Sequence, residues 1–339
     1  MILVFTNKDD VHPTPVIEKL CRIDVPVFRL NSEALLTDYH FCWWCRENGC
    51  GFIITNIHSG ITLESKDLTA VWDRRPEYPK ELYLESTEEI NQFNINEAKG
   101  FLRFFRGYIS RVPSIGSIAH DGMAESKMLQ YAIAHKVGLK TPSTCFSNRK
   151  EDIVKFASKY EDVALKPIGD DNITYQDGSE RVFFTQKVHS SLLSDIEVEA
   201  FSQTANFIQE YLPKDFELRV TVVYDRVFSC RIDSQLQDDN SGKIDWRQGY
   251  DKGLRHSIHN LPNNIAKKCI AFLEEMRLNY GAFDFIVTPS GDYIFLECNP
   301  NGQWLWIEME TGLKISDAIA DTLQHPEKLR RYAENCNKE

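Results

Sequence analysis

The chain has 339 residues, of which 42% are hydrophobic and 26% are charged, and its formal net charge is −11. At roughly 150 residues per domain, this length predicts two or three domains with enough apolar material for a substantial core. The acidic balance argues against a nucleic-acid partner, because binding to phosphate backbones needs a basic surface. No apolar run approaches the roughly 20 residues that a membrane helix needs, so we expect no membrane partner.

The cysteines bear on cellular location and on metal binding. Met1–Phe5 is apolar without a preceding basic stretch, which is typical of a first strand and not of a secretion signal. Nine scattered cysteines in such a chain predict reduced thiols and a cytoplasmic location. Cys42 and Cys45 form a C-x-x-C pair in an aromatic segment, followed by Cys50, but no second pair lies at zinc-ligand spacing. We therefore expect a packed helix face in this segment.

The first third of the chain alternates strand and helix patterns. Four short apolar runs predict strands and one amphipathic stretch predicts a helix: Ile2–Phe5, Val25–Leu30, Gly51–Thr55 and Thr69–Trp72 for the strands, and Pro15–Cys21 for the helix. Such alternation is typical of a parallel sheet with helices on its faces. A long helix follows, in which Ser86 and Glu89 form a capping box ahead of apolar residues at helical spacing. Because Pro113 and Gly116 end this helix, we place an N-terminal α/β domain at residues 1–115.

The middle of the chain predicts a second lobe, residues 116–205. A helix is expected over Gly122–Val137, where Gly138 supplies the C-terminal stop. The short strand Val163–Lys166 precedes the polar segment 169–181, which we expect to be an exposed mobile loop.

Strands dominate the rest of the chain and predict a third lobe, residues 206–326, with a tail at 327–339. The expected strands are Val182–Gln186, Asn206–Tyr211, Glu217–Val223, Val227–Asp233, Ala282–Val287 and Tyr293–Cys298. A helix over Pro262–Asn279 interrupts them, and another over Ile315–Leu323 follows them. The predicted fold class is α/β (α+β), with three lobes in series.

The strongest signal for chemistry is a hairpin around the tight-turn sequence P-S-G-D. A turn centred between Ser290 and Gly291 sets Asp284 directly opposite Glu297, with Asn299 on the same face. Two facing carboxylates destabilise a sheet unless a cation neutralises them. Two carboxylates and an amide oxygen suit Mg²⁺, with phosphates completing its shell. The alternative is a solvated acidic face, but the flanking phenylalanines favour a buried metal site.

Two further segments point to anion binding. Lys166 ends an apolar strand and fits a lysine that reaches nucleotide phosphates, although an edge-strand lysine that reaches solvent is the alternative. In the strand that begins at Glu217, a tight turn brings Arg219 alongside Arg231 and Glu217 alongside Asp233. Two arginines beside an acidic face suit phosphate or carboxylate binding, and cross-strand salt bridges are the alternative.

In their order along the chain, these residues resemble the ATP-grasp superfamily, over residues 2–325. That resemblance implies a pre-ATP-grasp domain, a central lobe and a C-terminal antiparallel-sheet lobe, with ATP between the last two lobes and an acyl-phosphate mechanism. It also implies that ATP and Mg²⁺ are bound by Lys127, Lys166, Gln209, Glu210, Tyr211 and Arg219 for the nucleotide, and by Asp284, Glu297 and Asn299 for the metal.

A closer resemblance is to the microviridin-type (graspetide) peptide ligases. It rests on A-V-W-D-R-R at 70–75, L-P-K at 212–214, D-S-Q at 233–235, D-W-R at 245–247 and Y-G-A-F-D at 280–284. Those enzymes join Asp or Glu side chains to Thr, Ser or Lys side chains within a ribosomal precursor peptide that has a leader and an acidic core. The resemblance implies an ADP-forming ligase of this kind and a homodimer. The alternatives are a ligase that adds amino acids to a protein tail or a small metabolite, and a nucleotide-binding regulator without turnover.

The residue types suggest roles within this resemblance. We expect Arg219 to contact the γ-phosphate or the acyl phosphate. Arg231 and Arg247 are candidates for holding the reacting carboxylate, and Asp233 is the candidate base for the acceptor. The two arginines of A-V-W-D-R-R either orient an acidic peptide or pair with acids nearby, such as Glu77.

Overall fold

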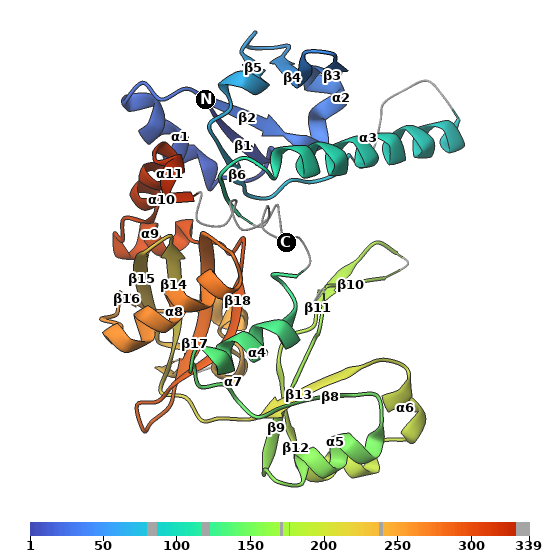
Figure 1. Cartoon of the computed structure of the whole chain (residues 1–339). Helices are drawn as coiled ribbons and strands as arrows, with labels where there is room; N and C mark the ends of the chain where they lie inside the picture. Colours follow the sequence, from blue (N-terminus) through green and yellow to red (C-terminus); the bar gives the residue numbers. More distant parts are fainter. Residues whose placement is uncertain (80–86, 117–122, 170–171, 176, 237–239, 330–339) are drawn as a thin grey trace.

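The computed structural model describes residues 1–79, 87–116, 123–169, 172–175, 177–236 and 240–329. Within these residues the strands form five sheets, two in the first third of the chain and three further along. Figure 1 shows three lobes, the first (blue to teal) at the top, the second (green to yellow) at the bottom and the third (olive to red) between them. The mixed α/β fold class is confirmed.

The N-terminal lobe is built on a parallel sheet with strand order β2-β1-β6-β7. Its strands are β1 (Ile2–Thr6), β2 (Val27–Asn31), β6 (Ala70–Asp73) and β7 (Ser114–Ile115). Helix α1 (Pro13–Arg22) packs on one face of this sheet and α3 (Glu88–Ile109) packs on the other. The residue before α3 is Thr87, and the expected capping residue Ser86 lies outside the described residues.

A separate antiparallel sheet covers α3. Its strands, in the order β3 (Tyr39–Arg46), β4 (Gly49–Asn56) and β5 (Thr62–Glu64), come after the short helix α2 (Leu35–Asp38) in the chain. The expected helix face around the C-x-x-C pair is therefore wrong, and Gly51–Thr55 does not join the parallel sheet. The physical reason is alternation with a period of two. Phe41 and Trp43 share one face of β3 and contact Phe101 and Tyr108 of α3, with ring centroids 4.1 Å and 6.0 Å apart.

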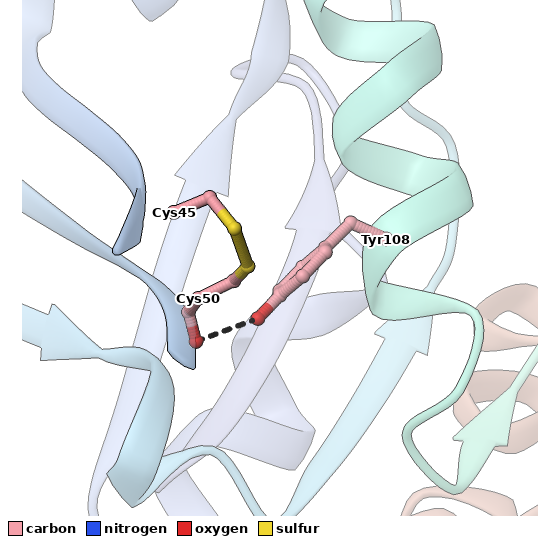
Figure 2. Close-up of a disulfide and its surroundings, with 3 residues drawn as sticks. All are labelled: Cys45, Cys50 and Tyr108. Atoms are coloured by element: carbon pink, nitrogen blue, oxygen red, sulfur yellow. Dashed lines mark hydrogen bonds between the residues drawn. A yellow bond between two sulfur atoms is a disulfide. The ribbon is translucent and has the colours of Figure 1, made fainter. Parts of the chain in front are cut away.

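A disulfide joins the two strands of this hairpin beside its turn (Figure 2). The β3–β4 register sets Cys45 directly opposite Cys50, which brings their side chains together. The Tyr108 hydroxyl of α3 donates to the Cys50 carbonyl at 3.4 Å. The expectation of reduced thiols is thus wrong for this pair, whereas Cys42 is free and exposed.

The central lobe contains an antiparallel sheet with strand order β12-β9-β13-β8. Its strands are β8 (Thr144–Ser147), β9 (Asp162–Lys166), β12 (Gln186–His189) and β13 (Asn206–Glu210), and α5 (Lys150–Ala157) and α6 (Val198–Ser202) pack on one face. Helix α4 (Lys127–Lys136) precedes them and is capped by Ser126, whose Oγ accepts from the Leu129 N–H. The expected start at Gly122 lies outside the described residues, but residues 123–126 are not helical, so the helix begins later than predicted.

The segment 169–181, expected to be a loop, contains most of an exposed two-stranded hairpin of β10 (Asn172–Thr174) and β11 (Glu180–Val182). Gly178 has a φ of 80° in its turn, a conformation that glycine adopts without strain. The strand predicted over Val182–Gln186 is accordingly divided, because β11 ends at its first residue and β12 begins at its last.

The third lobe is an antiparallel sheet with strand order β16-β15-β14-β17-β18. Its strands are β14 (Phe216–Val223), β15 (Arg226–Ile232), β16 (His256–Ile258), β17 (Tyr280–Val287) and β18 (Tyr293–Asn299). Its helices are α7 (Asn240–Ile244), α8 (Asn263–Glu275), α9 (Leu305–Thr311), α10 (Ile315–Gln324) and α11 (Pro326–Leu329). Helix α8 covers one face, whereas α10 joins a core with α1 and the N-terminal sheet. No helix in the described ranges is long and apolar enough to cross a membrane.

The hairpin β17–β18 reaches its predicted pairing by an unexpected route. Phe285 pairs with Phe295, so the turn is centred on Ser290 and the strands begin one residue out of the expected register. A bulge between Asp284 and Phe285 then restores the register, and Asp284 pairs with Glu297 as predicted. The bulge also turns Phe295 and Glu297 to opposite faces of the sheet, although they are only two residues apart.

The hairpin β14–β15 lies one residue out of its predicted register. Arg219 pairs with Cys230, and Arg231 pairs with Leu218. The turn holds two residues, and Tyr224 there has a φ of 57°, which is typical of tight two-residue hairpins. Because a shift of one residue turns every side chain to the other face, Arg231 lies on the face opposite to Arg219.

Candidate functional site

Two carboxylates and two cations form the centre of the site, on the face of the third sheet that α8 does not cover. Asp284 and Glu297 face each other across β17 and β18. Arg219, directly opposite Asp284 on β14, donates to its carboxylate at 2.7 Å. Lys127, the first residue of α4, donates to Glu297. Each carboxylate therefore has one cation of its own.

The two carboxyl groups differ in their affinity for protons. Burial raises the pKa of Asp284 to about 6, with Arg219 opposing the rise and the charge of Glu297 adding to it. Burial acts on Glu297 in the same direction, but Lys127, Lys166 and Arg219 outweigh it and hold the pKa of Glu297 below its usual range. Near neutral pH both groups are therefore negative and available to a cation.

These residues fit a Mg²⁺ ion by the chemistry of their donor atoms. Asn299 lies on the same face and turns its Nδ2 to Asp284 at 3.3 Å. Among the described residues, no group of three or more His, Cys, Asp or Glu side chains is arranged to hold a metal. Two carboxylates and one amide leave several positions of a Mg²⁺ shell for water and phosphate, as is usual for this ion.

Lys166 lies at the end of β9, beside this centre. Burial lowers the pKa of its ammonium group to about 8, and Lys127 and Lys214 lower it further against the charges of Glu297 and Asp245. Its ammonium group makes no hydrogen bond or ion pair with any described residue. The residue is half-buried. Since an ammonium group that is partly removed from water is costly without an anion, its environment suits a phosphate.

A buried carboxylate, Glu217, lies on the same face two residues before Arg219. Lys214 lies 2.7 Å from it, and the Ser234 hydroxyl donates to it at 2.9 Å. Burial raises the pKa of Glu217, against the charge of Lys214. The predicted neighbour of Glu217 was Asp233, but the shifted β14–β15 register pairs Glu217 with Ile232. Ser234, two residues beyond Ile232, supplies the hydroxyl that donates to Glu217. Lys214 is part of the L-P-K motif, so the sequence offered a signal for it, whereas Ser234 needed the correct register.

Three residues at the end of β13 and directly after it make contacts within the central lobe: Gln209, Glu210 and Tyr211. Gln209 donates to the Tyr131 hydroxyl at 2.8 Å, and its Oε1 is buried without a hydrogen bond from the described residues. The Glu210 carboxylate accepts from the Ser143 N–H at 2.8 Å, and the Lys187 ammonium lies 4.6 Å from the centre of the Tyr211 ring. A nucleotide contact of Gln209, Glu210 and Tyr211 stays a prediction.

The structure does not bring Arg231 and Asp233 to this centre. Arg231 lies 2.6 Å from Asp233 and 3.8 Å from the centre of the Phe216 ring, on the α8 face of the sheet. The expected alignment of Arg231 with Arg219 is therefore wrong, and so is the placement of Asp233 as a base on the same face as Asp284. The cause is again the two-residue turn between β14 and β15.

Arg247 lies near Lys166, through its partner Asp245. It pairs with Asp245 at 2.8 Å and lies 5.4 Å from the centre of the Phe184 ring of the central lobe. Asp245 in turn accepts from the Thr185 N–H at 3.3 Å and raises the pKa of Lys166. Arg247 thus joins the second and third lobes near Lys166, and its contact with a substrate carboxylate stays a prediction.

Comparison with known proteins identifies this arrangement. The sequence profile of the RimK-like ATP-grasp domain matches residues 124–323. No curated protein matches the sequence.

Solved structures match the chain over nearly its whole length. A Chryseobacterium gregarium RiPP-associated ATP-grasp ligase, in complex with ADP and a leader and core peptide, has a TM-score of 0.86 and 27% identity, covering 95% of this chain and 96% of that one. Macrocyclase MdnC from Microcystis aeruginosa MRC, bound with precursor peptide MdnA, has a TM-score of 0.81 and 28% identity, covering 96% and 99%. Macrocyclase MdnB from the same organism has a TM-score of 0.73 and 25% identity, covering 95% and 98%.

The predicted ATP-grasp fold is confirmed by these matches. Since the profile covers more than half of the sequence, the chain belongs to the RimK-like ATP-grasp family.

Proposed function

We propose that this protein is an ATP-dependent, ADP-forming peptide ligase that makes side-chain ester or amide crosslinks in a ribosomal precursor peptide. The crosslinks join Asp or Glu to Thr, Ser or Lys. The observation that carries the proposal is the match, over 95% of this chain, to a RiPP-associated ligase in complex with ADP and a leader and core peptide. That match includes the N-terminal lobe, which lies outside the ATP-grasp profile.

The site residues supply positive charge where the reaction needs it. Lys127, Lys166 and Arg219 would bind the phosphates of ATP. Asp284, Glu297 and Asn299 would hold Mg²⁺, which when bound neutralises phosphate charge.

The proposed reaction has two steps. A carboxylate oxygen of the acidic side chain forms a bond to the γ-phosphorus while the bond from that phosphorus to the bridging oxygen breaks, and ADP leaves with the electron pair. The acceptor hydroxyl or amine then attacks the acyl carbon and loses its proton, and phosphate leaves. The crosslink therefore forms with the net loss of one water from the peptide.

Location and assembly complete the proposal. We place the enzyme in the cytoplasm, where ATP and ribosomal peptides are made, and we propose that it is a homodimer. Ile90, Phe93 and Phe104 on α3 are 51%, 62% and 69% exposed, which supports a protein contact on this helix. Light scattering on the purified protein tests the dimer, and a monomeric mass at micromolar concentration would contradict it.

An intact-mass experiment tests the reaction. A candidate precursor peptide, short, acidic and containing Thr or Lys, is co-expressed with the wild-type enzyme or with Glu297→Gln. We expect the peptide to lose one or more waters only with the wild-type enzyme, and alkaline hydrolysis then distinguishes ester from amide. A peptide that binds without a change in mass would contradict crosslinking and favour ligation of free amino acids.

A further inference from the structure

The loop between β18 and α9 is held by donors from two strands and from the residue that follows a third. Arg74, which follows β6, donates to the carbonyl of Asn301. The Tyr280 hydroxyl of β17 donates to the Gly302 carbonyl at 2.8 Å, and Arg219 of β14 donates to the next carbonyl at 3.4 Å. The N-terminal lobe thus reaches the loop that directly follows Asn299, and guanidinium groups of both the N-terminal and the C-terminal lobe donate to this loop.

The guanidinium groups of Arg74 and Arg219 both have buried nitrogens without hydrogen-bond acceptors among the described residues. The Arg74 side chain is 2% exposed, and its Nε lies 3.6 Å from Asp10, too far for a hydrogen bond. Neither Nε nor Nη2 of Arg74 has a hydrogen-bond acceptor among the described residues, and the same holds for Nε of Arg219. Buried donors are nearly always satisfied, so these unpaired groups indicate a place where an anion or water belongs.

Arg75 extends this cluster to the surface. It is exposed, and its guanidinium makes no hydrogen bond or ion pair with the described residues, which excludes the alternative pairing with Glu77 within the described structure. Burial and the charge of Arg74 lower the pKa of the neighbouring His12 to about 4, so this histidine is neutral at pH 7. Asp10 accepts from the Thr6 hydroxyl at 2.7 Å and also forms an ion pair with Arg74, with 3.6 Å between its Oδ2 and Nε of Arg74.

Arg74, Arg75 and Arg219 lie together at this junction, since the charges of Arg75 and Arg219 add to the lowering of the Arg74 pKa by burial. Two of the three have an ion pair among the described residues, Arg74 with Asp10 and Arg219 with Asp284. The three arginines come from the carboxyl end of a strand in a parallel sheet, which is where α/β folds bind ligands, and from the facing antiparallel sheet. Arg219 also contacts Asp284, so an anion here would lie beside the residues proposed to bind Mg²⁺ and the phosphates of ATP.

We propose that Arg74, Arg75 and Arg219 form an anion site across the junction of the N-terminal and C-terminal lobes, in which Arg75 binds the reacting carboxylate of the acidic side chain. This inference rests on the proposed function. A guanidinium binds a carboxylate through two parallel hydrogen bonds, so the site selects Asp and Glu over their amides. Arg74 holds the loop behind the site, and Arg75 makes the contact.

The test measures carboxylate selectivity by binding, without turnover. Two labelled eight-residue peptides, one alternating Glu and Thr and the other Gln and Thr, are titrated against the Mg·ADP-loaded enzyme by fluorescence anisotropy. We expect the wild-type enzyme to prefer the Glu peptide about tenfold. Arg75→Ala should bind both peptides alike, and Arg75→Lys should keep part of the preference. The matched control is Arg103→Ala, an exposed arginine on α3, which should keep the full preference.

Three results would overturn the inference. These are a wild-type enzyme without preference, an Arg75→Ala variant with the wild-type preference, and an Arg75→Ala variant whose affinity for Mg·ADP falls more than about threefold. Failure of the proposed function would look different, because the wild-type enzyme would then select the Glu peptide and still leave the mass of the precursor unchanged.

Discussion

The two faces of the antiparallel sheet formed by β14, β17 and β18 differ in what they contribute to the protein. The α8 face is a phenylalanine core, where Phe283 lies 5.3 Å from Phe272 and 6.1 Å from Phe295 between ring centroids. The opposite face carries Arg219, Asp284 and Glu297 within hydrogen-bonding networks. One strand serves both faces because its side chains alternate. The difference teaches that folding and chemistry can be disturbed separately in this sheet.

The largest expected effect comes from a substitution that changes only the face with Arg219, Asp284 and Glu297, called the site face below. Glu297→Gln keeps the size of the side chain but removes the charge that faces Asp284. We expect kcat for ADP release to fall at least about a hundredfold, while the free energy of unfolding changes by no more than about 1 kcal/mol. Steady-state assays and urea unfolding measure the two quantities. Glu199→Gln on the exposed surface of α6 is the control and should keep the wild-type kcat. Wild-type turnover in Glu297→Gln would remove this residue from the site.

The next largest effect is expected from a substitution that changes only the core on the α8 face. Phe283→Ala should lower the free energy of unfolding by about 3–5 kcal/mol, because it leaves a cavity in a fully buried cluster. Leu192→Ala, at a side chain that is 55% exposed and lies outside α3, should change it by no more than about 0.5 kcal/mol. Urea titration gives both values. If Phe283→Ala instead weakened Mg·ADP binding and left stability intact, the division between the two faces would be wrong.

A pH titration sharpens the description of the site face. Phosphate binding favours protonated Lys166, and burial lowers the pKa of this group to about 8 in the free protein. Raising the pH from 7 to 9 removes the proton, so the affinity for Mg·ADP should fall about tenfold. Calorimetry across this range measures it.

The matched variant for the titration is Lys166→Arg, which stays charged up to pH 9. Its affinity for Mg·ADP should be nearly independent of pH. An equal fall in both proteins would assign the titration to another group.

The smallest expected effect concerns the facing carboxylates. Adding Mg²⁺ to the ADP-bound protein should raise Tm by about 2–5 °C, because the ion relieves the repulsion between Asp284 and Glu297. Burial raises the pKa of Asp284 to about 6, so the effect should shrink at pH 5, where this group is protonated. Differential scanning fluorimetry with EDTA as the control measures it. An increase in Tm that persists unchanged in Asp284→Asn would place the ion elsewhere.

The same two faces explain what the sequence could predict. The pairing of Asp284 with Glu297 was predictable from a tight turn and alternation, although the correct pairing arises because a shifted turn and a bulge compensate each other. The pairing of Arg231 was not predictable, because the left-handed Tyr224 that sets the turn carries no glycine or asparagine signal. The error of one residue in the predicted β14–β15 register placed two candidate catalytic residues, Arg231 and Asp233, on the wrong face of the sheet.

Outside this sheet, contacts between residues far apart in the chain limited what the sequence could predict. The sequence left open whether Lys166 reaches solvent or an anion, and the structure shows it half-buried at the end of β9. The contact of Arg74 with the carbonyl of Asn301 joins residues 227 positions apart, and no local pattern encodes it. The helix predicted around Cys42 was wrong for another reason, because a few aromatic residues do not distinguish a period of two from a helical period.

The acyl phosphate is the central claim, and oxygen-isotope transfer tests it most directly. The enzyme is supplied with ATP and with a precursor peptide whose Asp and Glu carboxylates carry ¹⁸O, and the released phosphate is analysed by mass spectrometry. The account predicts that one ¹⁸O enters the phosphate for each crosslink formed, because a carboxylate oxygen bonds to the γ-phosphorus before the acyl carbon is attacked. Crosslinked peptide accompanied by phosphate without ¹⁸O would contradict it.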